Sequence, residues 1–177
     1  MLRFMVRIFL VMALCSALQV YASDVEPFSL QWMNAPDQGM SYDSATHEAA
    51  IYVVEAYFKN CSTCNDNAPN LNALAAGYAN EPRVQVLDVS RDCRDADYRA
   101  WIATHKPNHP VLKDCALKLL SQLEIARYPT TVVLDCNLQP VFRHEGPWTP
   151  TVITRVRAVI DRTLRNNTCE VNHDLVQ

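Results

Sequence analysis

The sequence predicts an α/β domain with a mixed central sheet flanked by helices. Three observations support this class: an apolar run at Ile51 to Phe58, apolar residues at helical spacing after it, and a second strand-like run at Val84 to Val89. Strand, helix and strand in this order form a βαβ unit. Two β-branched runs and a last amphipathic segment follow, so the expected order is β-α-β, a helical connection, and β-β-α.

The first 22 residues form a predicted secretory signal. Arg3 and Arg7 precede the apolar stretch Ile8 to Leu18, and the small residues Val20 and Ala22 favour cleavage after Ala22. An uncleaved N-terminal anchor is the alternative. Cleavage leaves about 155 residues, which is the size of one domain.

The charge of the chain excludes some classes of partner. The formal net charge is -3, and it becomes about -5 without the two arginines of the signal. A mildly acidic chain without Lys/Arg clusters argues against nucleic acid and anionic membranes as partners. The sequence after the signal holds no further membrane-spanning candidate, so we expect no direct membrane insertion after cleavage.

Residues 23–47 predict an N-terminal extension, and residues 48–177 the main domain. The extension contains Pro27, Pro36 and Gly39 with little periodicity, which is typical of irregular structure with one short strand near Phe28 to Trp32. In the main domain, a helix from about Thr63 to Tyr78 follows the first strand. Its apolar residues share one face: Ala68, Leu71, Leu74, Ala75 and Tyr78.

An insertion at about residues 90–124 follows the βαβ unit. Within it, Asp97 to Thr104 and Val111 to Leu123 both have helical patterns. The β-branched run Thr130 to Asp135 and the short run Val141 to Arg143 then predict an antiparallel hairpin.

A final helix completes the predicted order. Thr149 is its expected N-cap, and Pro150 occupies its first position. The stripe on its inner face consists of Val152, Val156, Val159, Ile160 and Thr163.

Cys61 and Cys64 lie where the first strand meets the following helix. A helix start offers unpaired N–H groups and the positive end of the dipole, which stabilise a thiolate. We therefore expect a lowered pKa at Cys61, which acts as the nucleophile. Cys64 lies one turn deeper and can attack a mixed disulfide formed at Cys61.

The Cys-x-x-Cys spacing alone has two other interpretations, half of a zinc site and a plain structural disulfide. No second such pair or closely spaced histidine pair completes a zinc site, so a redox pair is the favoured interpretation. The five histidines are scattered, and we expect them at the surface.

Four further cysteines follow the signal and the dithiol: Cys93, Cys115, Cys136 and Cys169. An even number in an exported chain predicts structural disulfides, with three possible connectivities. We favour Cys93 with Cys115 and Cys136 with Cys169. The alternative is that one pair relays electrons to or from the dithiol.

The order of elements and the placement of the dithiol resemble the thioredoxin fold. Pro69 matches the family proline inside the active-site helix, and Tyr128-Pro129-Thr130 matches its cis-proline element. Glu55 falls where thioredoxins place a buried acid beneath the dithiol. The signal makes the chain most similar to exported bacterial thioredoxin-like and Dsb-type oxidoreductases.

The resemblance implies a periplasmic thiol-disulfide oxidoreductase that acts on protein thiols and disulfides. Cys61 and Cys64 would be catalytic with Glu55 as proton relay, and residues 128–130 would bind substrate. No cofactor or metal is implied, whereas a reducing direction implies a membrane redox partner. The alternative is a thioredoxin-fold binding or assembly module of a secretion or conjugation apparatus, whose Cys61–Cys64 bridge is structural. For Glu55, the alternative to a buried proton relay is a solvated side chain. For Pro129, the alternative to a cis peptide bond is an ordinary trans bond.

Overall fold

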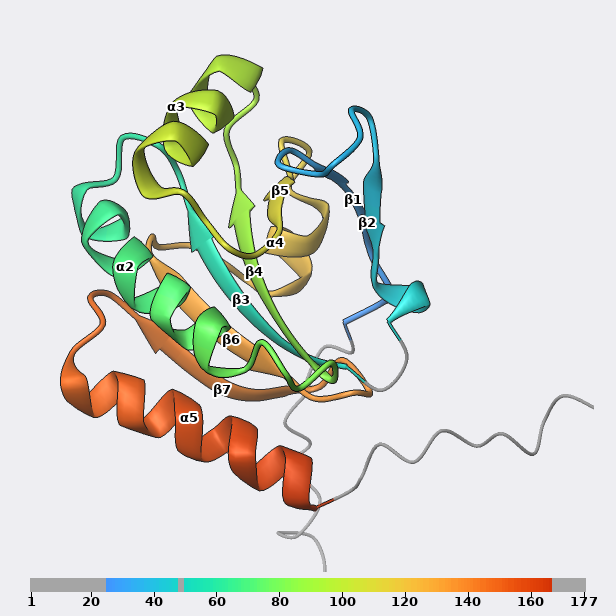
Figure 1. Cartoon of the computed structure of the whole chain (residues 1–177), viewed down its shortest axis with the longest axis vertical. Coiled ribbons are helices and arrows are strands. Elements are labelled where there is room, and N and C mark those ends of the chain that lie inside the picture. Colours follow the sequence, from blue (N-terminus) through green and yellow to red (C-terminus); the bar gives the residue numbers. More distant parts are fainter. Residues whose placement is uncertain (1–24, 48–49, 167–177) are drawn as a thin grey trace, which may run out of the picture.

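The computed structural model describes residues 25–47 and 50–166, which build a seven-stranded sheet with helices on both faces (Figure 1). The order across the sheet is β2-β1-β5-β4-β3-β6-β7. The strands are β1 (Ser29–Trp32), β2 (Ser41–Asp43), β3 (Ile51–Tyr57), β4 (Val84–Ser90), β5 (Val111–Lys113), β6 (Thr130–Leu134) and β7 (Pro140–Glu145). The predicted α/β class is confirmed. The predicted signal at residues 1–22 lies outside the described residues.

Helices cover both faces of the sheet. They are α2 (Ser62–Gly77), α3 (Asp95–His105), α4 (Lys118–Gln122) and α5 (Pro150–Arg165), with a 3-10 turn, η1 (Ser44–Thr46). Helices α2 and α5 lie on one face and α4 on the other (Figure 1). Side chains of β3 alternate accordingly, with Val53 in the core cluster of α2 and α5 and Val54 in the cluster of α4. Strand β3 is therefore buried on both faces.

Strands β3, β4 and β5 are parallel neighbours. Strand β6 is antiparallel to β3, and β7 is antiparallel to β6, so the predicted βαβ unit and hairpin are confirmed. The carboxyl ends of the three parallel strands meet at one edge of the sheet. The segments that follow these strands come together there, at the usual place for a functional site in such folds.

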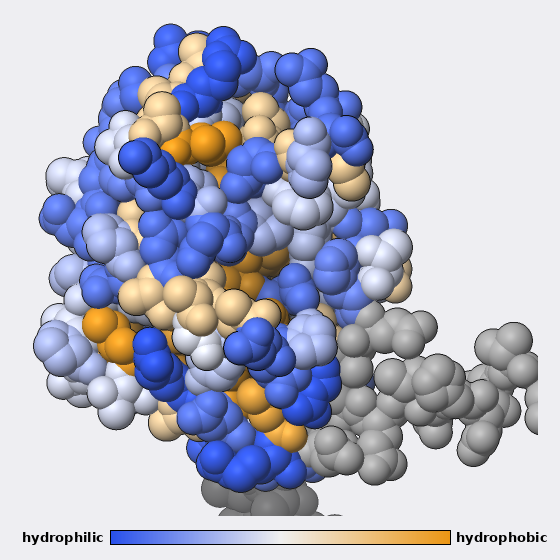
Figure 2. Space-filling view, viewed as in Figure 1, coloured by the Kyte–Doolittle hydropathy of each residue, from blue (hydrophilic) through white to orange (hydrophobic). Residues whose placement is uncertain are grey.

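The final helix begins as its sequence predicts. The Val152 N–H donates to the Thr149 hydroxyl over 3.3 Å, and Pro150 occupies the first position. Val156 and Ile160 are fully buried against the sheet. The outer face over α2 and α5 is mostly hydrophilic, with small separate apolar areas (Figure 2). None of the helices described here is long and apolar enough to cross a membrane.

The N-terminal extension joins the sheet. The predicted strand near Phe28 is confirmed as β1, whereas β2 was not expected. Strand β1 pairs with β2 on one side and with β5 on the other, and both pairings are antiparallel. Phe28 also packs edge-on against Tyr52 of β3, with ring centroids 5.6 Å apart. The extension is therefore part of the core structure.

The helix expected from Val111 to Leu123 is wrong in its first half. Val111 and Leu112 are fully buried in β5, between β1 and β4, and only residues 118–122 are helical. Strand β5 pairs with β1 and β4, so its backbone N–H and C=O groups form hydrogen bonds within the sheet. This pairing stabilises the strand more than the helical spacing of its side chains favours a helix. The other helix of the insertion is confirmed as α3.

Candidate active site

Cys61 and Cys64 form a disulfide at the start of α2, with Cα atoms 5.2 Å apart. Cys61 is the N-cap of this 16-residue helix, and its Sγ accepts the N–H of Cys64 over 3.1 Å. In the reduced protein the same N–H and the helix dipole favour a negative charge on Cys61. The geometry therefore suits a thiolate at Cys61.

The two cysteines of this bridge differ in exposure. Cys61 retains 7% of its surface and Cys64 only 2%. Beneath them lies an apolar cluster made of Tyr57, Ala68, Tyr98, Trp101 and Val111. A sulfur from another chain thus meets Cys61 first, whereas Cys64 is placed to react from the inner side.

Asn65 fixes the first turn of α2 from two directions. Its Nδ2 donates to the Cys61 carbonyl over 2.7 Å, and its Oδ1 lies 2.8 Å from Nε2 of His105. The second contact requires a proton on Nε2, and burial lowers the pKa of His105, which favours the neutral ring. Helix α3 is thereby tied to the turn that carries the disulfide.

Glu55 lies on β3 beneath α2 and is 3% exposed. Its carboxyl accepts hydrogen bonds from Asn67 of α2 at 2.9 Å and from Thr131 of β6 at 2.6 Å. Burial raises the pKa of Glu55 to about 7, and the charge of Asp88 adds to the rise, while the two hydrogen bonds oppose it. The described geometry therefore gives a buried acid that titrates near neutral pH.

Trp148 and Asn67 complete the support of Glu55. The Trp148 indole donates to the Thr131 hydroxyl over 2.8 Å, and the Trp148 N–H donates to Oδ1 of Asn67 over 2.8 Å. Neither residue was singled out from the sequence. A tryptophan between a strand and a helix N-cap carries no local signal of such a role.

Asp88 is a second buried acid that the sequence analysis missed. It lies opposite Glu55 in the β3–β4 register and is 2% exposed. The Trp101 indole donates to it over 2.9 Å, and Nε2 of His109 lies 3.4 Å away, without the alignment of a hydrogen bond. The expectation that every histidine lies at the surface is wrong for His109, because the segment after α3 folds inward to start β5. An acid inside an apolar strand was the available signal for Asp88.

The loop before β6 carries the predicted substrate element. The Tyr128–Pro129 peptide bond is cis. The half-buried Tyr128 ring packs against the cluster that contains Cys61 and lies edge-on to Phe58, with centroids 5.6 Å apart. Thr130 is fully buried and donates to the Arg127 carbonyl over 2.8 Å, so its side chain supports the loop from inside.

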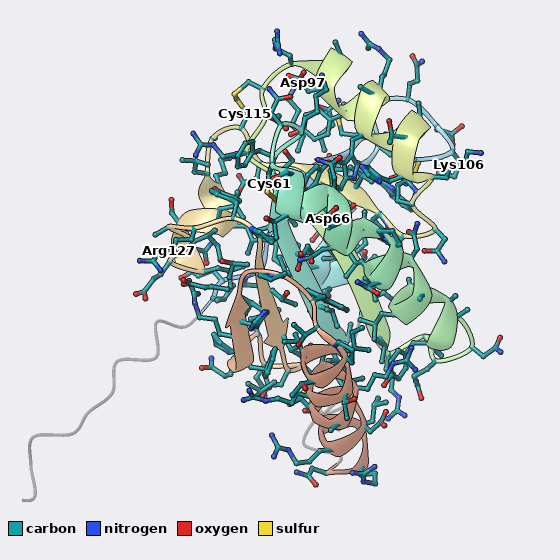
Figure 3. All side chains as sticks on the ribbon, turned by 90° about the vertical axis from the view of Figure 1, so that its left-hand side faces the viewer. Cys61, Asp66, Asp97, Lys106, Cys115 and Arg127 are labelled. Atoms are coloured by element: carbon teal, nitrogen blue, oxygen red, sulfur yellow. A yellow bond between two sulfur atoms is a disulfide. The ribbon has the colours of Figure 1, made fainter. Side chains whose placement is uncertain are left out.

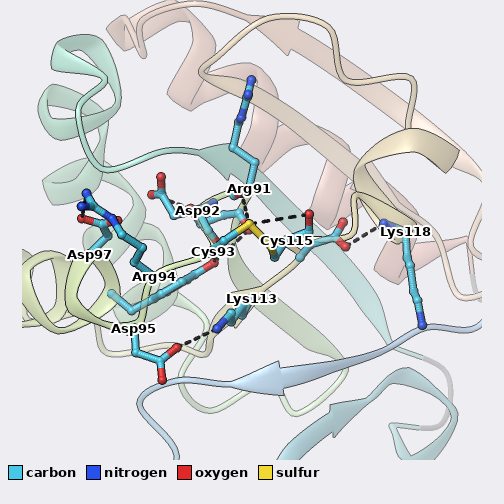
Figure 4. The surroundings of a disulfide bond; sticks show 12 residues. Arg91, Asp92, Cys93, Arg94, Asp95, Asp97, Lys113, Cys115 and Lys118 are labelled. Carbon is cyan, nitrogen blue, oxygen red and sulfur yellow. Dashed lines mark hydrogen bonds and ion pairs between the residues drawn. A yellow bond between two sulfur atoms is a disulfide. The ribbon is translucent and has the colours of Figure 1, made fainter.

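The structure also pairs Cys93 with Cys115, with Cα atoms 4.8 Å apart (Figure 4). Both residues are exposed and lie among charged side chains. Cys136 is disulfide-bonded as well. Cys169 lies outside the described residues, so its pairing with Cys136 stays a prediction. Within residues 25–47 and 50–166, no group of three His, Cys, Asp or Glu side chains could hold a metal ion.

Comparisons with known proteins place this geometry in context. No protein-family model and no curated protein sequence matches the chain. The solution structure of a putative thioredoxin from Neisseria meningitidis is similar, with a TM-score of 0.70 and 19% identity, over 85% of this chain and 97% of that chain. A putative thiol:disulfide interchange protein DsbE from Chlorobium tepidum gives a TM-score of 0.69 and 18% identity, over 80% and 95%.

A third similar structure is the exposed lipoprotein thioredoxin of Streptococcus pneumoniae. It has a TM-score of 0.63 and 22% identity, over 77% of this chain and 99% of that chain. Identities this low establish the fold alone. The chain has the thioredoxin fold, as the arrangement of the dithiol, Pro69 and Pro129 predicted.

Proposed function

We propose that the protein is a periplasmic thiol-disulfide oxidoreductase that exchanges disulfides with protein substrates through Cys61 and Cys64. The observation that carries the proposal is a disulfide at the N-cap of α2, next to a cis-proline loop and above a buried carboxyl. The names of the similar thioredoxin and interchange-protein structures support it. No cofactor is needed, because the two cysteines carry the electron pair.

Cys61 is the nucleophile of the proposed reaction. When the pair is reduced, its thiolate attacks a substrate disulfide and forms a mixed disulfide. Cys64 then attacks Cys61, the Cys61–Cys64 bond closes, and the substrate leaves as a dithiol. The reverse sequence oxidises a substrate dithiol, with the protein disulfide attacked at Cys61, which is the more accessible of the two.

Glu55 manages the proton of Cys64 in this scheme. A buried carboxylate with a pKa raised to about 7 can accept the proton of Cys64 when that thiol becomes a thiolate. It can release the proton again near neutral pH. Its hydrogen-bond partner Asn67 lies in α2, three residues after Cys64, which places the acid under the first turns of the helix.

Residues 128–130 form the proposed docking loop for the substrate chain. The Tyr128 ring offers a partly exposed apolar surface beside Cys61, and the cis Pro129 sets the course of the backbone there. Thr130 anchors the loop from its buried side.

The extracytoplasmic location rests on the predicted signal and is supported by the similar exposed lipoprotein thioredoxin. In that compartment, catalysis in the reducing direction needs a supply of electrons, which we assign to a membrane redox protein. In the oxidising direction, the same partner would accept electrons.

The test is a redox titration of the purified protein over graded ratios of reduced to oxidised glutathione, together with an insulin reduction assay. We expect Cys61–Cys64 to convert reversibly between disulfide and dithiol and to reduce insulin catalytically. A pair that stays oxidised under strongly reducing buffer, without activity, would favour the assembly module with a structural bridge.

A further inference from the structure

The second disulfide lies at the same edge of the sheet as the first. Cys61 follows parallel strand β3, Cys93 follows β4, and Cys115 follows β5. Neighbouring strands are about 4.8 Å apart, so the ends of three adjacent strands fall within about 10 Å. Figure 3 shows Cys61 and Cys115 at this common end of the molecule.

The loops that carry the two disulfides are bonded to one another. The Lys59 N–H donates to Asp92 over 2.7 Å, which joins the residues just before Cys61 and Cys93. The Asp114 N–H donates to the Ser90 carbonyl over 2.9 Å, which joins the segments that carry Cys115 and Cys93. The loops that carry the two disulfides are therefore neighbours at one surface.

Arg91 connects the second disulfide with the docking loop. Its guanidinium lies over the Tyr128 ring, 5.5 Å from the centroid, and Tyr128 packs against the cluster of Cys61. In Figure 4, Arg91 extends from the backbone near the Cys93–Cys115 bridge and away from it. Tyr128 therefore contacts both the cluster of Cys61 and the side chain of Arg91, which lies two residues before Cys93.

The Cys93–Cys115 bridge also differs from a typical structural disulfide. Both cysteines are exposed, whereas stable structural bridges resist reduction and exposed ones are the labile or catalytic ones. Its charged neighbours are mostly paired, Arg94 with Asp97 at 2.8 Å and Lys113 with Asp95 at 2.6 Å. Apart from the two cysteines, every residue that Figure 4 labels around the bridge carries a charge.

We infer that Cys93–Cys115 is a second redox-active disulfide that exchanges an electron pair with Cys61–Cys64. This inference rests on the proposed function and gives that site an internal relay partner. The thiolate of Cys61 attacks Cys93, because β4 is the strand next to β3. The Cys61–Cys93 bond forms, the Cys93–Cys115 bond breaks, and Cys115 leaves as a thiolate that takes up a proton.

Cys64 completes the transfer. It gives its proton to Glu55 and attacks Cys61, which forms Cys61–Cys64 and releases Cys93, which is then protonated. In total two electrons move from one pair to the other; Cys64 supplies one proton through Glu55, and solvent returns the proton that Cys61 lost on forming its thiolate. In the reverse direction, reduced Cys93 and Cys115 reduce the Cys61–Cys64 disulfide. A redox partner that reduces either pair therefore supplies electrons to both.

The first experiment follows each pair separately in the purified protein. Glutathione buffers set the potential, alkylation stops exchange, and peptide mass spectrometry reports the two pairs. We expect both pairs to titrate, and Cys93–Cys115 to equilibrate about tenfold or more faster in the wild type than in Cys61→Ser/Cys64→Ser. Thermal melting checks that the variant is folded.

Three results would overturn the relay. In the first, Cys93–Cys115 stays oxidised while Cys61–Cys64 titrates. In the second, Cys93–Cys115 equilibrates as fast in Cys61→Ser/Cys64→Ser as in the wild type. Either result leaves the proposed function intact. If Cys61–Cys64 also stays oxidised throughout and insulin is not reduced, the relay and the proposed function fall together.

A second experiment tests the attacked sulfur. The variant Cys64→Ser/Cys115→Ser leaves Cys61 and Cys93 free, and its matched control Cys64→Ser/Cys93→Ser leaves Cys61 and Cys115. On mild oxidation by glutathione disulfide we expect a Cys61–Cys93 crosslink in the first and little Cys61–Cys115 crosslink in the second. Absence of the first crosslink, or equal yields in both, would contradict the assignment of Cys93.

Discussion

The molecule places two disulfides at one edge of its sheet in opposite surroundings. Cys61–Cys64 spans three residues, caps a helix and rests on an apolar cluster above Glu55. Cys93–Cys115 spans 22 residues, joins two loops and is exposed among charged side chains. The bond is the same in both, so any difference in reactivity has to come from helix, burial and charge.

This contrast indicates that the first bridge serves reactivity and the second serves stability. A short bridge constrains the unfolded chain little, whereas the helix N-cap and the buried acid beneath it act on the thiolate and its proton. The longer bridge closes the loop that contains α3 and β5, and so contributes more to stability. The relay would add a redox role to this structural one. The predictions below test the contrast, from the largest effect to the smallest.

The largest effect is expected from Cys61→Ser. Loss of the nucleophile should lower the rate of insulin reduction by about a thousandfold or more, because neither Cys93 nor Cys115 is the N-cap of a helix that would stabilise its thiolate. The matched variant Cys64→Ser keeps the nucleophile and should instead accumulate a mixed disulfide, seen by mass spectrometry. Unchanged activity of Cys61→Ser would remove the basis for distinguishing the two bridges.

Glu55→Gln should slow the resolving step about a hundredfold at pH 7, because an amide cannot take a proton from Cys64. The substitution keeps the shape of the side chain. The amide oxygen can accept from Asn67, and the amide nitrogen can donate to the Thr131 hydroxyl, which reverses the direction of that bond. Single-turnover kinetics measure this step. Thr154→Ala, on the exposed face of α5, is the control and should leave the rate unchanged.

The same variant has a predicted effect on stability. The folded pKa of about 7 lies above the ordinary value of 4.5, so the folded chain binds this proton more tightly. Stability from this group is present below pH 4.5 and is lost as the pH rises to 7, by about 3 kcal/mol in total. Glu55→Gln should therefore be more stable than the wild type above pH 7, with little difference at pH 4. Denaturant unfolding at both pH values measures this, and a pH-independent difference would contradict it.

Removal of each bridge should have unequal effects on stability. By loop-closure entropy, Cys93→Ser/Cys115→Ser lowers the free energy of unfolding by about 3.4 kcal/mol and Cys61→Ser/Cys64→Ser by about 1.9 kcal/mol. The difference of about 1.5 kcal/mol follows from loop length. Urea unfolding of both variants beside the oxidised wild type measures it, and equal losses would show that closure of the longer loop adds nothing.

The smallest effect is expected from Arg91→Ala. Loss of the cation over the half-buried Tyr128 ring costs about 1 kcal/mol. Burial raises the pKa of Tyr128 and the charge of Arg91 opposes that rise, so the variant should have a higher Tyr128 pKa. Ultraviolet titration of the phenol detects this shift, and Arg91→Lys should restore part of it. An unchanged titration would show that Arg91 does not hold its place beside the docking loop.

Local patterns in the sequence were sufficient for much of the fold. The apolar run of β3, the N-cap of α5 and the hairpin of β6 and β7 each have signals within a few residues. Strand β5 had none, because three residues buried by partners far along the chain have the same apolar pattern as the start of a helix. Strand β2 likewise depends on β1, whose place is set by β5.

The sequence singled out candidate residues where one residue type implies a chemistry, as for Cys61 and Glu55. Residues that act by position were missed, namely Asn67, Thr131 and Trp148, because their roles exist only once three elements pack together. Asp88 carried the same signal as Glu55, a charge inside an apolar strand, and could have been found by it.

The pairing of β1 with β5 has a consequence for the order of assembly. Gln31 and Lys113 are register partners although roughly 80 residues separate them, so this ladder closes late. A chain that emerges with its N-terminus first exposes Phe28, Leu30 and Tyr42 long before their sheet exists. During that interval the hairpin of β1 and β2 has an unpaired edge that can pair with other chains. This segment is therefore the part of the chain most prone to aggregation during synthesis, and a chaperone would have to cover it.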